Sequence, residues 1–314
     1  MRRPGFLSIC VLLSSLPCVA GPSCKVDVIF QRTPKRTAHL EQVLARAEAG
    51  DRGAQFQAGL AFETGNGGEQ DYAAAVRWYR KAADQGDASA QNNLGGMFLR
   101  GLGVEQSDSE ALRWYLRAAA EGYLPAQNNV GFMNAAGRGT KANDEEAVRW
   151  YERAAEKGYA PAQANLGFMY SQGRGVARNG DEAVRWYQKA TAQNYAPAEF
   201  KLGLLYYEGA VIAQDLTEGL RWLQKAAGHG SAAAENEIAF AYEHGKGVPQ
   251  NYEQAAKWYR MAAEHGLPEA RHNLEILAAR QETSGTSASS EDSAGSSGNY
   301  AGPGQGFVGG RAPN

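Results

Sequence analysis

The chain has 314 residues, 43% of them hydrophobic and 21% charged, with a formal net charge of −2. It has no block of basic residues, which argues against a nucleic-acid partner and against binding to an anionic membrane surface. The composition is ordinary for a soluble globular protein, and only one apolar run stands out, at the N-terminus.

Residues 1–20 read MRRPGFLSICVLLSSLPCVA, with Arg2 and Arg3 before a short apolar core and a small-x-small end at Ala20. This pattern predicts a secretory signal peptide cleaved near Ala20. The alternative is a retained anchor, but the apolar run is shorter than the roughly 20 residues that span a bilayer. We therefore expect a periplasmic or secreted protein with no transmembrane segment in the mature chain. Cleavage would leave Cys24 alone in an N-terminal extension, residues 21–36, either free or paired between chains.

A repeat dominates the middle of the chain, where three residue types recur at a step of 36 residues without an insertion. The tryptophans are Trp78, Trp114, Trp150, Trp186, Trp222 and Trp258. The alanines are Ala82, Ala118, Ala154, Ala190, Ala226 and Ala262, and the glycines are Gly65, Gly101, Gly137, Gly173, Gly209 and Gly245.

Each unit is predicted to be two helices. In residues 87–122 the first helix carries an apolar stripe that includes Leu94 and ends at Gly101, where glycine favours a left-handed helix cap. The second helix opens at Ser107 with Glu110 three residues later, which is typical of a capping box. The Trp-Tyr pair is predicted to fill the space between one unit and the next, so that stacking is obligatory.

The regions flanking the repeats differ from them. Residues 37–50 resemble half a unit and predict an N-terminal capping helix, and residues 269–280 predict a last helix. From Gln281 to the C-terminus, residues 281–314, the chain is rich in Gly and Ser and is predicted to be disordered.

The pattern Ala-x-x-x-Leu-Gly-x-x-Tyr-x-x-Gly-x-Gly, then Glu-Ala-x-Arg-Trp-Tyr-x-x-Ala-Ala-x-x-Gly, resembles the Sel-one-like repeat (SLR), a relative of the tetratricopeptide repeat. The resemblance implies an all-α fold, an α-solenoid of six 36-residue helix-turn-helix repeats forming a right-handed superhelix over residues 37–280. Repeat five departs from the pattern at Gly219, Leu223 and Val211, and repeat three departs from it at Asn134.

A search for chemistry finds no nucleophile elbow, no zinc-protease motif and no paired cysteines within the repeats. The five histidines share no repeat position, so we predict no enzyme, no metal and no cofactor. A basic ridge follows the second helices, but Glu110, Glu146, Glu182 and Glu218 each lie three residues before an arginine and are expected to neutralise it.

Helical geometry predicts where a partner binds. Two residues after the core position, on the side of each first helix that faces away from the stack, a ladder of large apolar residues is predicted at Phe132, Phe168, Leu204 and Phe240. Phe200, Asn128, Tyr207 and Glu243 flank the ladder, and its expected place is the concave wall of the superhelix. A protein partner suits aromatic anchors with a polar surround. The alternative is that superhelical curvature buries these residues against neighbouring first helices.

The expected function is that of an exported protein-binding scaffold that uses its concave face. Its most concrete form is a periplasmic immunity protein that binds and neutralises a toxic effector enzyme, for example a secreted phospholipase. The alternative is a scaffold or adaptor in an envelope-assembly, secretion or host-interaction complex.

Overall fold

The computed structural model describes residues 37–291, with side chains described through Arg280. Helices are the only regular secondary structure in this part of the chain. They are α1 (Ala38–Glu48), α2 (Arg52–Thr64), α3 (Tyr72–Asp84), α4 (Ala88–Arg100), α5 (Asp108–Ala120), α6 (Leu124–Ala136), α7 (Asp144–Glu156), α8 (Ala160–Gln172), α9 (Gly180–Thr191), α10 (Ala196–Glu208), α11 (Leu216–Gly228), α12 (Ala232–His244), α13 (Tyr252–Glu264) and α14 (Pro268–Glu291).

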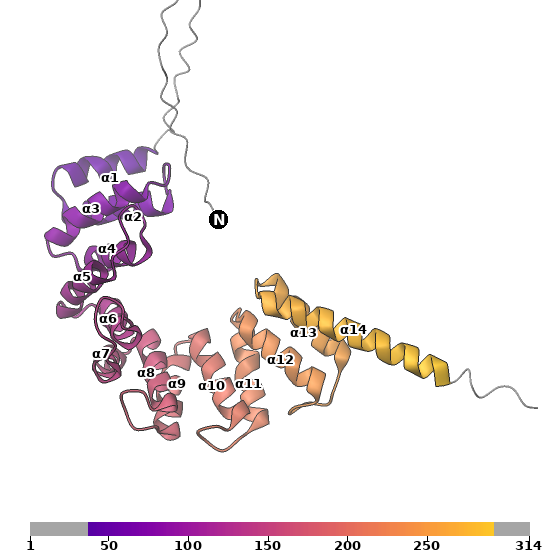
Figure 1. Ribbon diagram of the computed structural model, residues 1–314. Helices are drawn as coiled ribbons and strands as arrows, with labels where there is room; N and C mark the ends of the chain where they lie inside the picture. Colours follow the sequence, from indigo (N-terminus) through magenta and orange to yellow (C-terminus); the bar gives the residue numbers. More distant parts are fainter. Residues whose placement is uncertain (1–36, 292–314) are drawn as a thin grey trace, which may run out of the picture.

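Consecutive helices pack against one another, and Figure 1 shows them following a curved path from α1 to α14. Even-numbered helices α2 to α12 are the first helices of six units, and the odd-numbered helices α3 to α13 are the second helices. The predicted all-α solenoid is confirmed. The predicted signal peptide (1–20) and the N-terminal extension (21–36) lie outside the described residues.

Each unit begins and ends its helices with its own local signals. Ser107, Asn143, Asn179, Asp215 and Asn251 cap the second helices, each accepting a backbone N–H three residues later. First helices end at a glycine with a left-handed φ, as at Gly101 (φ 68°) and Gly137 (φ 66°). The helix boundaries therefore follow from local sequence, before any packing.

Tyrosine and tryptophan have separate structural roles. A Cβ added to Gly59 would lie 2.5 Å from the ring of Tyr79, and one added to Gly131 would lie 2.7 Å from the ring of Tyr151. The tyrosine therefore packs on a glycine within its own unit, and the Tyr79 hydroxyl also accepts a hydrogen bond from Asn93 of the next unit at 3.2 Å. Four of the six tryptophans are only half-buried. A cation covers the ring one turn later, as with Lys81 over Trp78 at 4.2 Å.

Polar side chains also join one unit to the next. Gln55, Gln91, Gln127 and Gln163 are buried, and each donates from Nε2 to a carbonyl of the helix that precedes its own at 3.1–3.2 Å. Arg138 and Arg174 hold the carboxylates of Asp108 and Asp144 of the preceding unit through two nitrogens each. The Arg138 guanidinium keeps the pKa of Asp108 below its usual value.

The last helix is longer than the sequence indicated. The predicted solenoid ends at Arg280 and disorder is predicted from Gln281, but α14 continues to Glu291. Extending an existing helix avoids the cost of nucleation, so a stretch with weak helical signals can continue one. Residues 292–314 lie outside the described part of the chain.

Candidate functional site

The first helices line the inner side of the curve. First helices of neighbouring units contact each other directly, α2 with α4 and α8 with α10. Asparagine side chains also bond between them: Asn129 to Asn92 at 2.9 Å, Asn165 to Asn128 at 2.8 Å and Asn273 to Asn236 at 3.0 Å. In Figure 1, α2, α4 and α6 lie on the concave side of the arc.

The predicted ladder is unevenly exposed on this face. Phe132 on α6 is 44% exposed. Phe168 on α8, Leu204 and Phe200 on α10, and Phe240 on α12 are half-buried. Neighbouring helices therefore cover much of these four side chains, and Phe132 is the ladder residue most available to a partner.

Two ladder residues line one pocket. Between α6 and α8, Phe132 and Phe168 line a cavity of about 220 Å³ together with Ala135, Asn165 and Arg174. This volume suits a single large side chain of a partner. Arg174 already binds Asp144 through two nitrogens, so the pocket contains no free cation from this arginine.

The ladder extends in both directions beyond the residues that the sequence singled out as a site. Five large hydrophobic side chains are more than a third exposed in the described part of the chain, and Leu60 (42%), Phe132 and Ile276 (37%) occupy the same position in their helices. Ile276 was missed, although it lies 36 residues after Phe240. We define the inner apolar stripe as Leu60, Phe132, Phe168, Leu204, Phe240 and Ile276.

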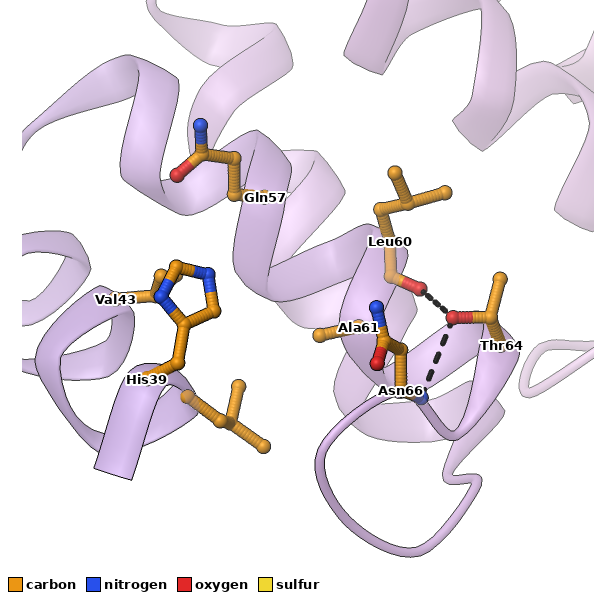
Figure 2. Close-up of a pocket in the computed structure, with 8 residues that line it drawn as sticks. His39, Val43, Gln57, Leu60, Ala61, Thr64 and Asn66 are labelled. Carbon is orange, nitrogen blue, oxygen red and sulfur yellow. Dashed lines mark hydrogen bonds between the residues drawn. The ribbon is translucent and has the colours of Figure 1, made fainter. Parts of the chain in front are cut away.

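A larger pocket lies at the N-terminal end of the stripe, between α1 and α2. Its volume is about 550 Å³, and its lining includes His39, Val43, Leu60 and Thr64 (Figure 2). Thr64 donates its hydroxyl to the Leu60 carbonyl at 2.8 Å, which holds the end of α2. In the described part of the chain no first helix precedes α1. The surface of α2 that faces this pocket is therefore open, whereas a first helix of the preceding unit covers the same surface in the inner units.

The flanking polar residues mostly serve the fold. Asn128 accepts the bond from Asn165. Glu243 is buried and binds the Tyr259 hydroxyl and the Arg280 guanidinium, both at 2.8 Å. Tyr207 is also buried, with no hydrogen-bond partner for its hydroxyl. The structure thus places Tyr207 and Glu243 inside the solenoid and not on the groove surface that the sequence predicted for them.

The burial of Tyr207 has a local cause. Repeat five has Leu223 in place of the packing tyrosine and Gly219 in place of alanine. A Cβ added to Gly219 would lie 2.8 Å from the Tyr207 backbone nitrogen and 2.9 Å from its Cβ. The lack of a side chain at Gly219 thus lets the backbone of Tyr207 approach α11 closely, and Tyr207 packs in the same core cluster as Leu223.

The two helices at the centre of the inner face carry no charged residue of their own, and Arg174, which follows α8, is paired with Asp144. Helices α6 and α8 contain no Asp, Glu, Lys, Arg or His in thirteen residues each. Charged residues on the first helices lie toward the two ends, as with Glu63 and Arg100, which pair at 3.1 Å. The centre of the groove is therefore suited to an uncharged, partly apolar surface of a partner.

Most ionisable side chains of the described residues that have a shifted pKa or a close partner owe it to packing within the solenoid. Burial raises the pKa of Tyr115 and Tyr151 to about 12. His229 and His265 bind the buried carboxylates of Glu199 (2.7 Å) and Glu235 (2.9 Å). On the outer face Arg113, Arg149, Arg185 and Arg221 pair with the glutamates three residues earlier, as the sequence predicted.

Residues 37–291 contain no group of three or more His, Cys, Asp or Glu residues placed to hold a metal ion. No helix in this part of the chain has the length and apolar content needed to cross a membrane.

The fold and the stripe define a class: an α-solenoid of stacked two-helix repeats with a concave apolar surface. The Sel1 repeat family model matches residues 53–87, 88–123, 124–159, 160–195, 196–231 and 232–267. The chain therefore belongs to the Sel1 repeat family, whose repeats mediate protein–protein interaction.

Solved structures of the same fold include two at more than 30% identity. A protective antigen present in uropathogenic Escherichia coli strains is 34% identical, with a TM-score of 0.66 over 77% of this chain and 52% of that chain. A Sel1 repeat protein from Oxalobacter formigenes is 31% identical, with a TM-score of 0.64 over 71% of this chain and 94% of that chain. The match spans about half the length of the antigen's chain.

A more remote similarity is to an immunity protein from Pseudomonas aeruginosa, 19% identical with a TM-score of 0.48 over 74% of this chain and 84% of that chain. A similarity at this distance carries no argument about function. Among curated proteins, no match was found.

Proposed function

We propose that this protein is an exported scaffold that binds a protein partner on its concave face. The observation that carries the proposal is the inner apolar stripe, because three of its members are the large side chains that packing leaves most exposed on that face. Exposed apolar groups aligned on one surface favour a protein-binding site. Export is supported by the signal-peptide pattern of residues 1–20.

In its most concrete form, the proposed function is that of a periplasmic immunity protein that neutralises a toxic effector enzyme, such as a secreted phospholipase. A curved solenoid can block the active-site cleft of an enzyme with its surface alone, and no catalytic motif is found in the sequence. The alternative is an adaptor in an envelope-assembly, secretion or host-interaction complex, which would use the same groove.

The binding surface is tested best at Phe132. Phe168→Ala would confound binding with stability, because Phe168 is half-buried between two core clusters. Phe132→Ala removes an exposed ring, and Leu116→Ala on α5 is a matched control because Leu116 is 40% exposed on a second helix. We expect Phe132→Ala to weaken capture of the partner from an envelope extract by about thirtyfold, the effect of truncating a central anchor. Leu116→Ala should leave capture unchanged.

The identity of the captured partner separates the two functions. An enzyme that is toxic when expressed alone, and against which the wild type but not Phe132→Ala protects cells, supports the immunity role. Components of an assembly or secretion machine would favour the adaptor. Equal capture by the wild type and Phe132→Ala would reject the concave face as the site. N-terminal sequencing of the mature protein tests export, and an intact Met1 in a cytosolic fraction would contradict it.

A further inference from the structure

The pocket between α1 and α2 lacks the side chain that fills the same repeat position in the next units. Ala61 lines the pocket and is half-buried. In the following three units this position holds Met97, Met133 and Met169, and all three are buried. The pocket volume of about 550 Å³ is more than twice that of the cavity between α6 and α8, so it accommodates more than one apolar side chain.

The repeat pattern does not continue into the N-terminal extension, residues 21–36. Gly65 and its equivalents end the first helices, but 36 residues before Gly65 the sequence has Ile29. Pro22 stands 36 residues before Ala58, which is inside α2, and a proline inside a helix breaks it. The extension is therefore not predicted to form another first helix, and the pocket needs a different kind of cover.

The chain enters α1 beside this pocket. Thr37 caps α1, and its backbone N–H donates to the Gly67 carbonyl at 2.8 Å. A Cβ added to Gly67 would lie 2.6 Å from the Thr37 Oγ1, so the two segments are in close contact. Asn66 and His39, which adjoin these two residues in sequence, both line the pocket. The residues directly before Thr37 therefore start next to the pocket.

The extension carries an apolar run within reach of the pocket, although it lies outside the described residues. Residues 26–30 read VDVIF. In an extended chain alternate side chains share one side, which groups Val26, Val28 and Phe30. The seven residues from Phe30 to Thr37 span up to about 23 Å when extended. Helix α1 has 11 residues and is about 16 Å long, so Phe30 can reach any part of the pocket.

We propose that residues 26–30 bind in the α1–α2 pocket of their own chain, with the Phe30 ring packed on Leu60 and Ala61. The two walls of the pocket, with His39 on α1 and Leu60 on α2, are shown in Figure 2. The short tether gives the segment an effective concentration of about millimolar at the pocket, so modest apolar contacts hold it there.

Binding of this segment completes the first unit of the solenoid. It removes the Leu60 side chain, which is 42% exposed in the described residues, from water. It also gives α2 the cover that inner units receive from a preceding first helix, and terminal repeats need such capping. The inference concerns the chain itself and needs no partner. The part of the inner apolar stripe that is open to a partner then begins at Phe132.

The first test locates Phe30 by photo-crosslinking. The purified protein carries benzoylphenylalanine in place of Phe30, and its peptides are analysed by mass spectrometry after irradiation. We expect crosslinks within one chain to α1 and α2, at residues such as His39 and Leu60. Benzoylphenylalanine in place of Tyr252, an exposed side chain on α13, is the control and should not crosslink to these helices. Crosslinks from position 30 spread over other helices would overturn the proposal.

The second test measures the contact by thermal unfolding. Phe30→Ala should lower the melting temperature by about 2–4 °C, because the ring no longer covers the pocket. Gln31→Ala is the matched control, since the next residue of an extended chain points to the opposite side. In a Leu60→Asp background, Phe30→Ala should have little further effect, because the pocket wall has already lost its apolar contact. Equal melting temperatures of Phe30→Ala and the wild type would overturn the proposal.

The same variants identify any other occupant of the pocket. Crosslinks between two chains, seen as a dimer on a denaturing gel, would place the segment on a second copy and reject binding within one chain. Loss of partner capture in Leu60→Asp, with no crosslink from position 30 to the pocket, would assign the pocket to the partner and also overturn the proposal. The proposed function fails separately, if the wild type and Phe132→Ala capture the partner equally.

Discussion

The Asn165 side chain on α8 donates from Nδ2 to Oδ1 of Asn128 on α6 at 2.8 Å, and so joins the first helices of two successive units. The same bond recurs at the same spacing between Asn129 and Asn92. Asn128 was predicted to flank the apolar ladder and to contact a partner, but its side-chain oxygen accepts a hydrogen bond within the solenoid. These two asparagine bonds therefore fix how the first helices lie against one another on the face that we propose for binding.

Asn128→Ala should lower the free energy of unfolding by about 1–2 kcal/mol, because the half-buried Asn165 amide would lose its acceptor. Urea denaturation of Asn128→Ala, Asn165→Ala and the double variant gives the coupling between the two side chains. Gln172→Ala, an exposed residue on α8, is the control. Strictly additive effects of the two asparagine changes would contradict a stabilising role for the hydrogen bond between Asn165 and Asn128.

His265→Ala should destabilise the C-terminal end of the solenoid by about 2 kcal/mol, because the buried Glu235 carboxylate loses its hydrogen-bond partner. Gln163 and Gln193 make the equivalent contact as a neutral amide pair at 3.0 Å in the fourth unit. We therefore expect the double variant Glu235→Gln/His265→Gln to recover most of the lost stability in urea denaturation. A double variant as unstable as His265→Ala would show that the amide pair cannot replace the contact between His265 and Glu235.

Gly219→Ala should destabilise the protein by about 1–3 kcal/mol, although alanine normally stabilises a helix relative to glycine. The added Cβ would lie 2.8–2.9 Å from Tyr207 atoms and 3.0 Å from the Gly203 carbonyl oxygen. Thermal unfolding provides the measurement, and Gly228→Ala is the control because a Cβ there meets nothing within 4 Å. A higher melting temperature for Gly219→Ala would contradict the tight packing of repeat five.

Stability should fall between about pH 10 and 12 through the buried tyrosines. Burial raises the pKa of Tyr151 from 10.0 to about 12, so the folded state holds the phenolic proton at pH values where the unfolded state has lost it. The stabilisation from this difference is complete below pH 10, and it is lost as the pH rises through 12. A rise of about two pKa units corresponds to about 3 kcal/mol.

Tyr151→Phe should remove part of this alkaline loss in melting temperatures measured from pH 8 to 12. Tyr252→Phe is the control, since Tyr252 is an exposed side chain. An unchanged slope in Tyr151→Phe would show that other groups account for the alkaline loss.

The sequence by itself determined the helices, their caps and the number of units. These depend on local signals, such as Asn143 at a helix start and Gly137 at a helix end, and the 36-residue step repeats them in phase. It also identified the position of the stripe within the first helix, because helical periodicity separates the face toward Leu94 from the face away from it.

Only the tertiary structure decided how exposed each stripe residue is and which polar side chains are engaged in the fold. Phe132 and Phe168 share a repeat position, yet one is exposed and the other half-buried, because burial depends on the side chains of neighbouring units. Glu243 and Tyr207 were expected on the groove from the angle of their position. Arg280 and Tyr259, which come from later helices, bind Glu243, and the lack of a side chain at Gly219 on α11 lets Tyr207 approach closely. Such contacts join residues far apart in the chain, and periodicity within one helix carries no information about them.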